Sequence, residues 1–292
     1  MRTETHSFGD DTLTATVSVQ GAELVSLKLQ DGTDVLWDAG SAWRRHSPVL
    51  FPIVGQLPNN EALINGKTYR MTQHGFARDK TFQWLERNPD GCVLELQADD
   101  ETLALFPFQF RLWLTYQIVN GELTVTYTVR NRETGREMPF SLGVHPAFRW
   151  PLQAGKMRED YRLVFEEAEP EPIRRLEKGL LDPAARPTPV KGCTLALHDD
   201  LFTEDAIIFD KIRSRFVEFG APGGTNLHFS WHGFPQMGVW TKPGAHFLCI
   251  EPWQGYATPH GFSGEFRTKP GVVLLQPDQE WTAHWAVKAV TA

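Results

Sequence analysis

The most regular segment of the chain covers residues 112–129 and reads LWLTYQIVNGELTVTYTV. Apolar side chains occupy every second position on both sides of Asn120-Gly121, as expected for two strands that each bury one face. Asn-Gly strongly favours a type I′ turn between antiparallel strands. Thr124, Thr126 and Thr128 take the alternate positions of the second arm, which suits a partly exposed pleated surface. The segment therefore predicts a β-hairpin.

The same pattern extends outward from this hairpin. Apolar residues recur at period two, or form short strand-like runs, in residues 13–19, 25–29, 206–209, 216–219, 227–231, 237–240, 247–251 and 281–289. Only residues 100–105 suggest a helix, and it is short. No repeat of fixed period is present, which argues against a propeller or a solenoid. We therefore expect one all-β, sandwich-like domain over residues 1–292.

Residues 152–195 are the least regular part of the chain and contain Glu- and Pro-rich stretches. A domain linker and a long surface excursion between strands would both explain them. The similar strand spacing on either side favours the excursion.

Composition and charge exclude several classes of protein. The 292 residues are 41% hydrophobic, which excludes general disorder, and carry a net charge of −7. No basic run is present, so we expect neither nucleic acid nor a membrane surface as a partner. No apolar stretch approaches the roughly 18 residues of a membrane helix, and the N-terminus shows no signal peptide. The three cysteines lie far apart, which predicts reduced, mostly buried thiols in a cytoplasmic protein.

Three clusters combine an ionisable side chain with Gly, Pro and aromatic residues. They are SPVLFPIVGQ (47–56) with QHGFARD (73–79), SLGVHPAF (141–148) and FLCIEPWQG (247–255). In each, a strand-like stretch brings His74, His145 or Glu251 to a point marked by a strand breaker, a common setting for functional residues. Taken singly, each is more often a hydrogen-bonded structural residue. Together they offer paired acid–base chemistry on a neutral polar substrate.

Other motifs predict no further chemistry. His228 and His232 have a spacing that binds zinc on a helix, but residues 227–231 alternate as a strand, so no metal site is expected. No nucleotide-binding loop or GxSxG motif occurs in a usable context. The glycine-rich turn at 220–224 is followed by no helix, which makes it a poor phosphate cradle.

In sequence and in order, these clusters resemble the motifs of the aldose 1-epimerase (galactose mutarotase-like) family, most closely its LacX-like branch. The matching segments are PVLFPIVG (48–55), QHGFAR (73–78), GVHPAF (143–148) and CIEPW (249–253). The resemblance implies a large antiparallel β-sandwich with a sugar cleft on one concave face. It also implies interconversion of the α and β anomers of a free hexose without metal or cofactor. A small sugar is then the expected partner, and we expect a monomer or weak homodimer.

The resemblance also implies roles for individual residues. His145 corresponds to the general acid toward the ring oxygen and Glu251 to the base for the anomeric hydroxyl. His74 corresponds to the residue that holds and polarises the sugar. An aspartate that binds sugar hydroxyls is best matched by Asp205, with Asp210 as the less favoured choice. The acid and base are expected on opposite sides of the C1–O5 unit of the sugar.

The resemblance leaves two points open in the binding cleft. Many relatives carry an arginine shortly after the FPxxG segment, where this chain has Gln56; Arg78, Arg44 or Arg45 would have to supply the cation. Trp253, beside the proposed base, either offers a flat apolar face to the sugar ring or packs in the core.

Two other functions compete with a mutarotase. A non-catalytic carbohydrate-binding protein has no need for a paired acid and base, so His145 and Glu251 favour the enzyme. A hexose-6-phosphate 1-epimerase should need several cleft arginines, against which Gln56 and the negative net charge argue weakly. An enzyme working near neutral pH needs the pKa of His145 raised, most simply by the nearby charge of Glu251 or Asp205.

Overall fold

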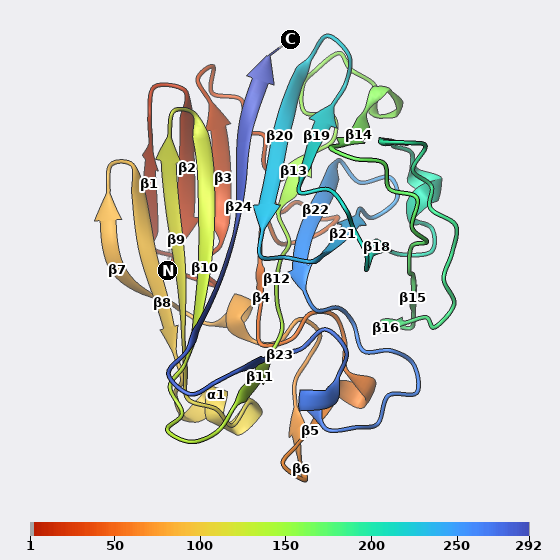
Figure 1. The fold of residues 1–292 in the computed structure, drawn as a ribbon. Coiled ribbons are helices and arrows are strands. Elements are labelled where there is room, and N and C mark those ends of the chain that lie inside the picture. The colour runs from red at the N-terminus through yellow and green to blue at the C-terminus, as the bar shows by residue number, and fades with distance from the viewer. Residues whose placement is uncertain (1–2, 292) are drawn as a thin grey trace.

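The largest element of the computed structural model, which describes residues 3–291, is a nine-stranded antiparallel sheet (Figure 1). The predicted hairpin forms part of this sheet, with Leu123 opposite Ile118 and Val125 opposite Tyr116. Asn120 and Gly121 have φ angles of 53° and 73°, as a type I′ turn requires. The strand order is β17 (Thr194–Ala196), β14 (Arg162–Phe165), β19 (Phe216–Gly220), β20 (Thr225–His232), β24 (Glu280–Thr291), β10 (Glu122–Asn131), β9 (Phe110–Val119), β8 (Gly91–Gln97) and β7 (Gln83–Asn88).

Two smaller sheets form the second layer. The first consists of β1 (Thr5–Gly9), β2 (Leu13–Ser18) and β3 (Leu24–Leu29). The second has six strands and carries the site described below. Its members are β18 (Ile207–Phe209), β21 (Gln236–Trp240), β22 (Phe247–Gln254), β12 (Leu142–Val144), β4 (Val49–Leu50) and β13 (Ala147–Arg149), which pairs with β22.

Short elements lie between the strands of the sheets along the chain. The expected helical turn is α1 (Asp100–Leu105), which begins with a capping box between Asp99 and Thr102. Three small antiparallel pairs are β5 (Glu61–Ile64) with β6 (Lys67–Arg70), β11 (Met138–Phe140) with β23 (Val273–Leu275), and β15 (Leu176–Glu177) with β16 (Leu180–Leu181). The 3₁₀ turns are η1 (Pro58–Asn60), η2 (Ala77–Asp79), η3 (Arg158–Asp160), η4 (Asp199–Phe202) and η5 (Phe266–Thr268).

The hydrophobic core fills the space between the two layers. One cluster of buried side chains includes residues from Phe8 to Val287. Phe110 of the large sheet packs against Phe51 with ring centroids 5.1 Å apart, and Phe229 packs against Phe148 at 5.9 Å. The two layers therefore form the all-β antiparallel sandwich that the sequence predicts.

Several narrower expectations can be compared with the structure. β14 and β17, from the irregular region 152–195, pair with each other and join the large sheet through β19. His228 and His232 lie on strand β20, as expected, and His228 contacts Glu218 at 3.0 Å. All three cysteines are free thiols, and two of them, Cys92 and Cys249, are buried. Within residues 3–291, every helix is too short or too polar to span a lipid bilayer.

Strand β22 separates the core from a second, functional face. Leu248 and Ile250 belong to the main core cluster. Successive side chains of a strand point to opposite faces, so Cys249, Glu251 and Trp253 lie on the other face of the six-stranded sheet. Since the strand continues to Gln254, Glu251 lies within it and not at its end.

Candidate active site

A cleft of about 260 Å³ opens on this outer face of the six-stranded sheet. Its walls come from strands and loops that lie far apart in sequence, between Trp43 and Ala257. Predicted site residues that line it are His74, Arg78, His145, Asp205, Glu251 and Trp253. The sheet thus gathers the three sequence clusters around one cavity.

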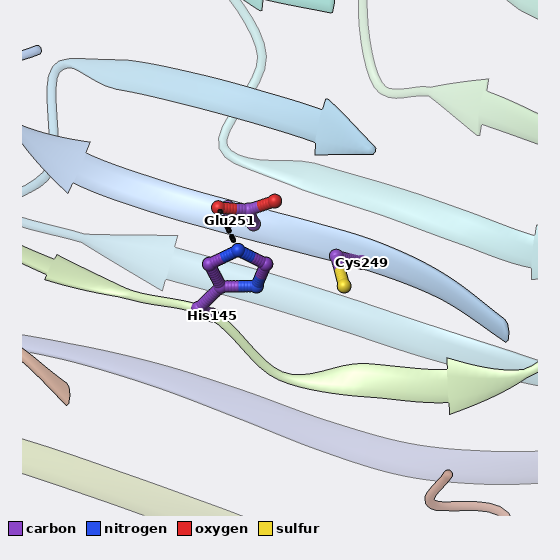
Figure 2. Close-up of side chains that lie close together, drawn as sticks. All are labelled: His145, Cys249 and Glu251. Carbon is purple, nitrogen blue, oxygen red and sulfur yellow. Dashed lines mark ion pairs between the residues drawn. The ribbon is translucent and has the colours of Figure 1, made fainter. Parts of the chain in front are cut away.

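His145 and Glu251 are in direct contact within this cleft. His145 directly follows β12, which pairs with β22, and its Nε2 lies 3.2 Å from the Oε2 of Glu251 (Figure 2). Both residues are nearly inaccessible, with 7% and 1% of their surfaces exposed. The predicted acid and base therefore lie side by side in the cleft.

Burial controls the protonation of this pair. Loss of hydration, together with the smaller effect of the positive charge of Arg78, lowers the pKa of His145 to about 3. Burial also raises the pKa of Glu251 well above its usual range, and the nearby charge of Asp205 adds to this effect. The prediction that neighbouring charge raises the pKa of His145 is thus wrong, because desolvation dominates. Both shifts favour a net-neutral pair in which the carboxyl group and the imidazole share one proton.

The backbone fixes the tautomer of His74. Its Nδ1 accepts a hydrogen bond from the N–H of Gly55 at 3.1 Å, so in the neutral ring the proton sits on Nε2. Burial lowers the pKa of His74 well below its usual value, and His145 and Arg78 add to this, so the ring is neutral near pH 7. His74 also has a φ angle of 68°, and its N–H bonds the carbonyl of Gly55. The side chain is thus held as a hydrogen-bond donor toward the cleft.

Arg78 is the arginine that lines the cleft, whereas Gln56 does not line it. The Arg78 Nη2 donates to the carbonyl of Gln73 at 2.6 Å, and Arg45 lies nearby, bound to Asp79 at 2.7 Å. The Gln56 Oε1 instead lies against Gly179, at the turn between β15 and β16. Of the alternatives left open by the sequence, geometry favours Arg78 as the cleft cation.

Asp205 lines the cleft, whereas Asp210 does not. A φ angle of 67° places Asp205 in a tight turn before β18, and its carbonyl accepts a hydrogen bond from Arg175 at 2.8 Å. Asp210 lies 3.7 Å from Arg174 instead. The structure therefore favours the first of the two candidates for contact with a ligand.

Several buried polar atoms at the cleft lack a partner. Among residues 3–291, His145 Nδ1, Arg78 Nε and Trp253 Nε1 form no hydrogen bond. Buried polar groups are nearly always satisfied in native proteins, and exceptions concentrate where a ligand or water completes the network. The cleft thus offers unused hydrogen-bonding capacity to a polar ligand.

Similarity to known proteins identifies the family of this chain. Residues 4–288 match the family model described as Aldose 1-epimerase. The chain belongs to the aldose 1-epimerase family. Protein LacX (chromosomal) of Lactococcus lactis subsp. lactis is 33% identical over 276 residues, which span 91% of this chain and 92% of LacX. The family resemblance of the sequence motifs is thereby confirmed.

Solved structures extend the match to the fold. A galactose mutarotase related enzyme from Lactobacillus acidophilus superimposes with a TM-score of 0.91 at 29% identity, covering 99% of this chain and 98% of that one. A galactose mutarotase-like protein from Lactobacillus casei gives 0.91 at 29%, covering 98% and 100%. Membership in the aldose 1-epimerase family and these folds support an isomerase of the sugar epimerase or mutarotase kind.

In this member of the aldose 1-epimerase family, two tryptophans that the sequence analysis missed complete the cleft. Trp43 stacks on His145 with ring centroids 4.8 Å apart, and Trp240 meets the same ring edge-on at 5.8 Å. Trp240 pairs with Cys249 across β21 and β22, so it lies on the same sheet face as Glu251. Strand register would have revealed Trp240, whereas Trp43 lies in a loop with no distinguishing pattern.

Two glycines make room for the indole of Trp253. A Cβ added at Gly238 would lie 2.4 Å from the Trp253 ring, and one added at Gly143 would lie 2.6 Å from it. Both glycines lie on strands that flank β22. The indole is therefore closely packed, with 5% of the residue exposed, and it still lines the cleft. Trp253 can thus both pack within the protein and offer an apolar face to a ligand.

We expect Gly238→Ala to displace this indole. Overpacking of this kind should lower the free energy of unfolding by about 1–3 kcal/mol and weaken sugar binding. Chemical denaturation and sugar titration measure the two effects. The control is Gly135→Ala, where no atom of the described residues lies within 4 Å of the added methyl. Equal stabilities of the two variants would contradict the packing role.

Proposed function

We propose that the protein is a mutarotase that interconverts the α and β anomers of a free hexose. The direct contact between the buried carboxyl group of Glu251 and the imidazole of His145, at the cleft, is the observation that carries this proposal. In a cyclic hemiacetal, the anomeric oxygen and the ring oxygen are bonded to the same carbon. An acid and a base that lie side by side can therefore reach both oxygens at once.

Ring opening then requires two proton transfers. Glu251 accepts the proton of the anomeric hydroxyl while His145 donates one to the ring oxygen, and the C1–O5 bond breaks to give the open-chain aldehyde. Rotation about C1–C2 presents the other face of the carbonyl. Closure with the two roles reversed gives the other anomer and restores the pair.

The pair keeps the same net charge throughout this cycle. Burial favours the form with the proton on Glu251, so the shared proton first moves across the contact to His145. The pair that opens the ring is then a carboxylate and an imidazolium, and after opening it is a carboxylic acid and a neutral imidazole. Both forms carry one shared proton and are net neutral. Because an uncompensated charge in a buried site is costly, this balance favours both states of the reaction.

The remaining cleft residues would hold the sugar. His74 is positioned as a neutral donor, Arg78 supplies a cation, and Asp205 offers acceptors to sugar hydroxyls. Trp253 would present an apolar face to the ring. Gln56 does not line the cleft and so lies outside this proposed binding set.

Polarimetry of freshly dissolved sugars tests the proposal. A panel of free and 6-phosphorylated hexoses should show faster anomer equilibration than buffer for at least one free hexose. Acceleration confined to phosphorylated sugars would instead indicate a hexose-6-phosphate 1-epimerase. Sugar binding without acceleration would indicate a carbohydrate-binding protein.

The pH profile should be bell-shaped and broad, because the pair must hold one shared proton. Burial lowers the pKa of His145 from 6.5 to about 3 and raises that of Glu251 well above 4.5. The pair then binds a second proton only far below pH 6.5, and it loses its one shared proton only well above pH 4.5. We expect kcat/KM, measured in chelating buffer, to stay flat well below pH 6.5. An acid limb centred near the ordinary histidine value would contradict this account.

Chelation should leave the activity unchanged, because side chains supply both proton transfers. Dialysis against a chelator, followed by polarimetry, checks this expectation. Activity that is lost on dialysis and restored by zinc or calcium would show a metal requirement that the proposed mechanism lacks.

A further inference from the structure

Cys249 lies beside the catalytic pair but takes no part in the proposed proton transfers. Its sulfur, a ring nitrogen of His145 and a carboxylate oxygen of Glu251 all lie within 4.8 Å of one another (Figure 2). Cys249 and Glu251 are two positions apart on β22, so they project from the same face of the sheet. The fold therefore gathers a sulfur, a nitrogen and an oxygen ligand next to an open cleft.

The spacing suits a small tetrahedral ion. Bonds of about 2.0–2.3 Å to Zn²⁺ place ligand atoms roughly 3.3–3.7 Å apart. The 3.2 Å between His145 Nε2 and Glu251 Oε2 is already close to this value. The Cys249 sulfur, within 4.8 Å of the other two ligand atoms, has to move closer for one ion to bind all three. His145 and Glu251 line the cleft, whereas Cys249 is buried and does not line it, so an ion would enter from the cleft side, where a water could take the fourth position.

The charges at the site select the kind of ion. Arg78 and Arg45 act on His145 with positive charge, which disfavours a dication unless anionic ligands neutralise it. A thiolate and a carboxylate together supply two negative charges. Mg²⁺ and Ca²⁺ prefer about six or more oxygen ligands, whereas this cluster offers one carboxylate. A mixed S, N and O set instead suits Zn²⁺ and similar thiophilic ions.

We propose that His145, Cys249 and Glu251 form an inhibitory site for a thiophilic divalent ion, with Zn²⁺ as the best-fitting one. Binding releases two protons to solvent, one from the thiol and one from the His145–Glu251 pair. The bound ion then occupies both the acid and the base, so metal and sugar exclude each other. The metal site itself does not depend on the proposed function, but the inhibitory role of the bound metal rests on that function.

Titration of the full chain with Co²⁺ tests the metal site directly. We expect the intense visible bands of a tetrahedral site and a sulfur-to-cobalt charge-transfer band, both abolished by Zn²⁺. Cys249→Ser should remove the sulfur band and weaken Zn²⁺ binding more than about tenfold. Cys92→Ser, which also removes a buried thiol, should change neither. A wild-type spectrum without the sulfur band, or unchanged Zn²⁺ affinity in Cys249→Ser, would overturn the site.

A second variant covers the case in which Cys249→Ser does not fold. In the double variant Cys92→Ser/Cys193→Ser, Cys249 is the remaining thiol, so the sulfur band must persist; its loss would overturn the site.

Competition between metal and sugar tests the inhibitory role. Zn²⁺ should raise the apparent KM of anomer exchange in the wild type, and much less in Cys249→Ser. Zn²⁺ that binds without affecting sugar affinity would overturn this role. An enzyme inactive even after metal removal would count against the proposed function instead, and competition would then be measured by sugar binding.

Discussion

Replacing Glu251 by glutamine is expected to lower kcat for anomer exchange by at least about 10²-fold. The amide preserves the size of the side chain but cannot accept the anomeric proton. The fold should remain intact, because the substitution removes an ionisable group whose charged form burial and Asp205 already disfavour. Stopped-flow polarimetry, with circular dichroism to check folding, measures the effect.

Glu177→Gln is the matched control for this variant. Glu177 lies in β15, and 62% of its side chain is exposed, so its loss should leave kcat near the wild-type value. A folded Glu251→Gln variant with near-wild-type kcat would remove Glu251 from the mechanism.

Replacing His145 by asparagine should reduce kcat by a similar factor of at least about 10². Asparagine can still hydrogen-bond to Glu251 but cannot deliver a proton to the ring oxygen at neutral pH. In the residual activity only the base titrates, so the rate should rise with pH through the pKa of Glu251 and then level off. The basic limb of the bell should therefore disappear.

The control for this variant is His228→Asn, on the large sheet, where the imidazole contacts Glu218. Its profile should match that of the wild type. If His145→Asn retains both limbs of the bell, the general acid lies elsewhere.

The fold was predictable because strand signals are local. Period-two alternation and one Asn-Gly turn identify the hairpin at 112–129, and the structure confirms it residue by residue. Strand order was not predictable in this way, because it depends on pairings between residues far apart in sequence. β10, for example, pairs with β24, more than a hundred residues away.

The site was predictable to the extent that motifs carry it. His74, His145 and Glu251 were identified from their sequence context, and the structure places them in one cleft. The direction of the pKa shift of His145 was not predictable, because it depends on burial, which only the folded chain defines. Trp43 was not predictable for a related reason: it contacts His145 from a loop that has no regular sequence periodicity.

The central claim is that the buried pair in the cleft opens and closes the sugar ring, and exchange NMR tests it most directly. The α and β anomers of each free hexose give separate proton signals, so magnetisation transfer between them measures the interconversion rate at equilibrium. For at least one sugar, we expect the wild type to accelerate this transfer, and Glu251→Gln to bind the same sugar but return the rate to that of buffer. Wild-type protein that binds sugars yet leaves every anomer exchange rate at the buffer value would contradict the account.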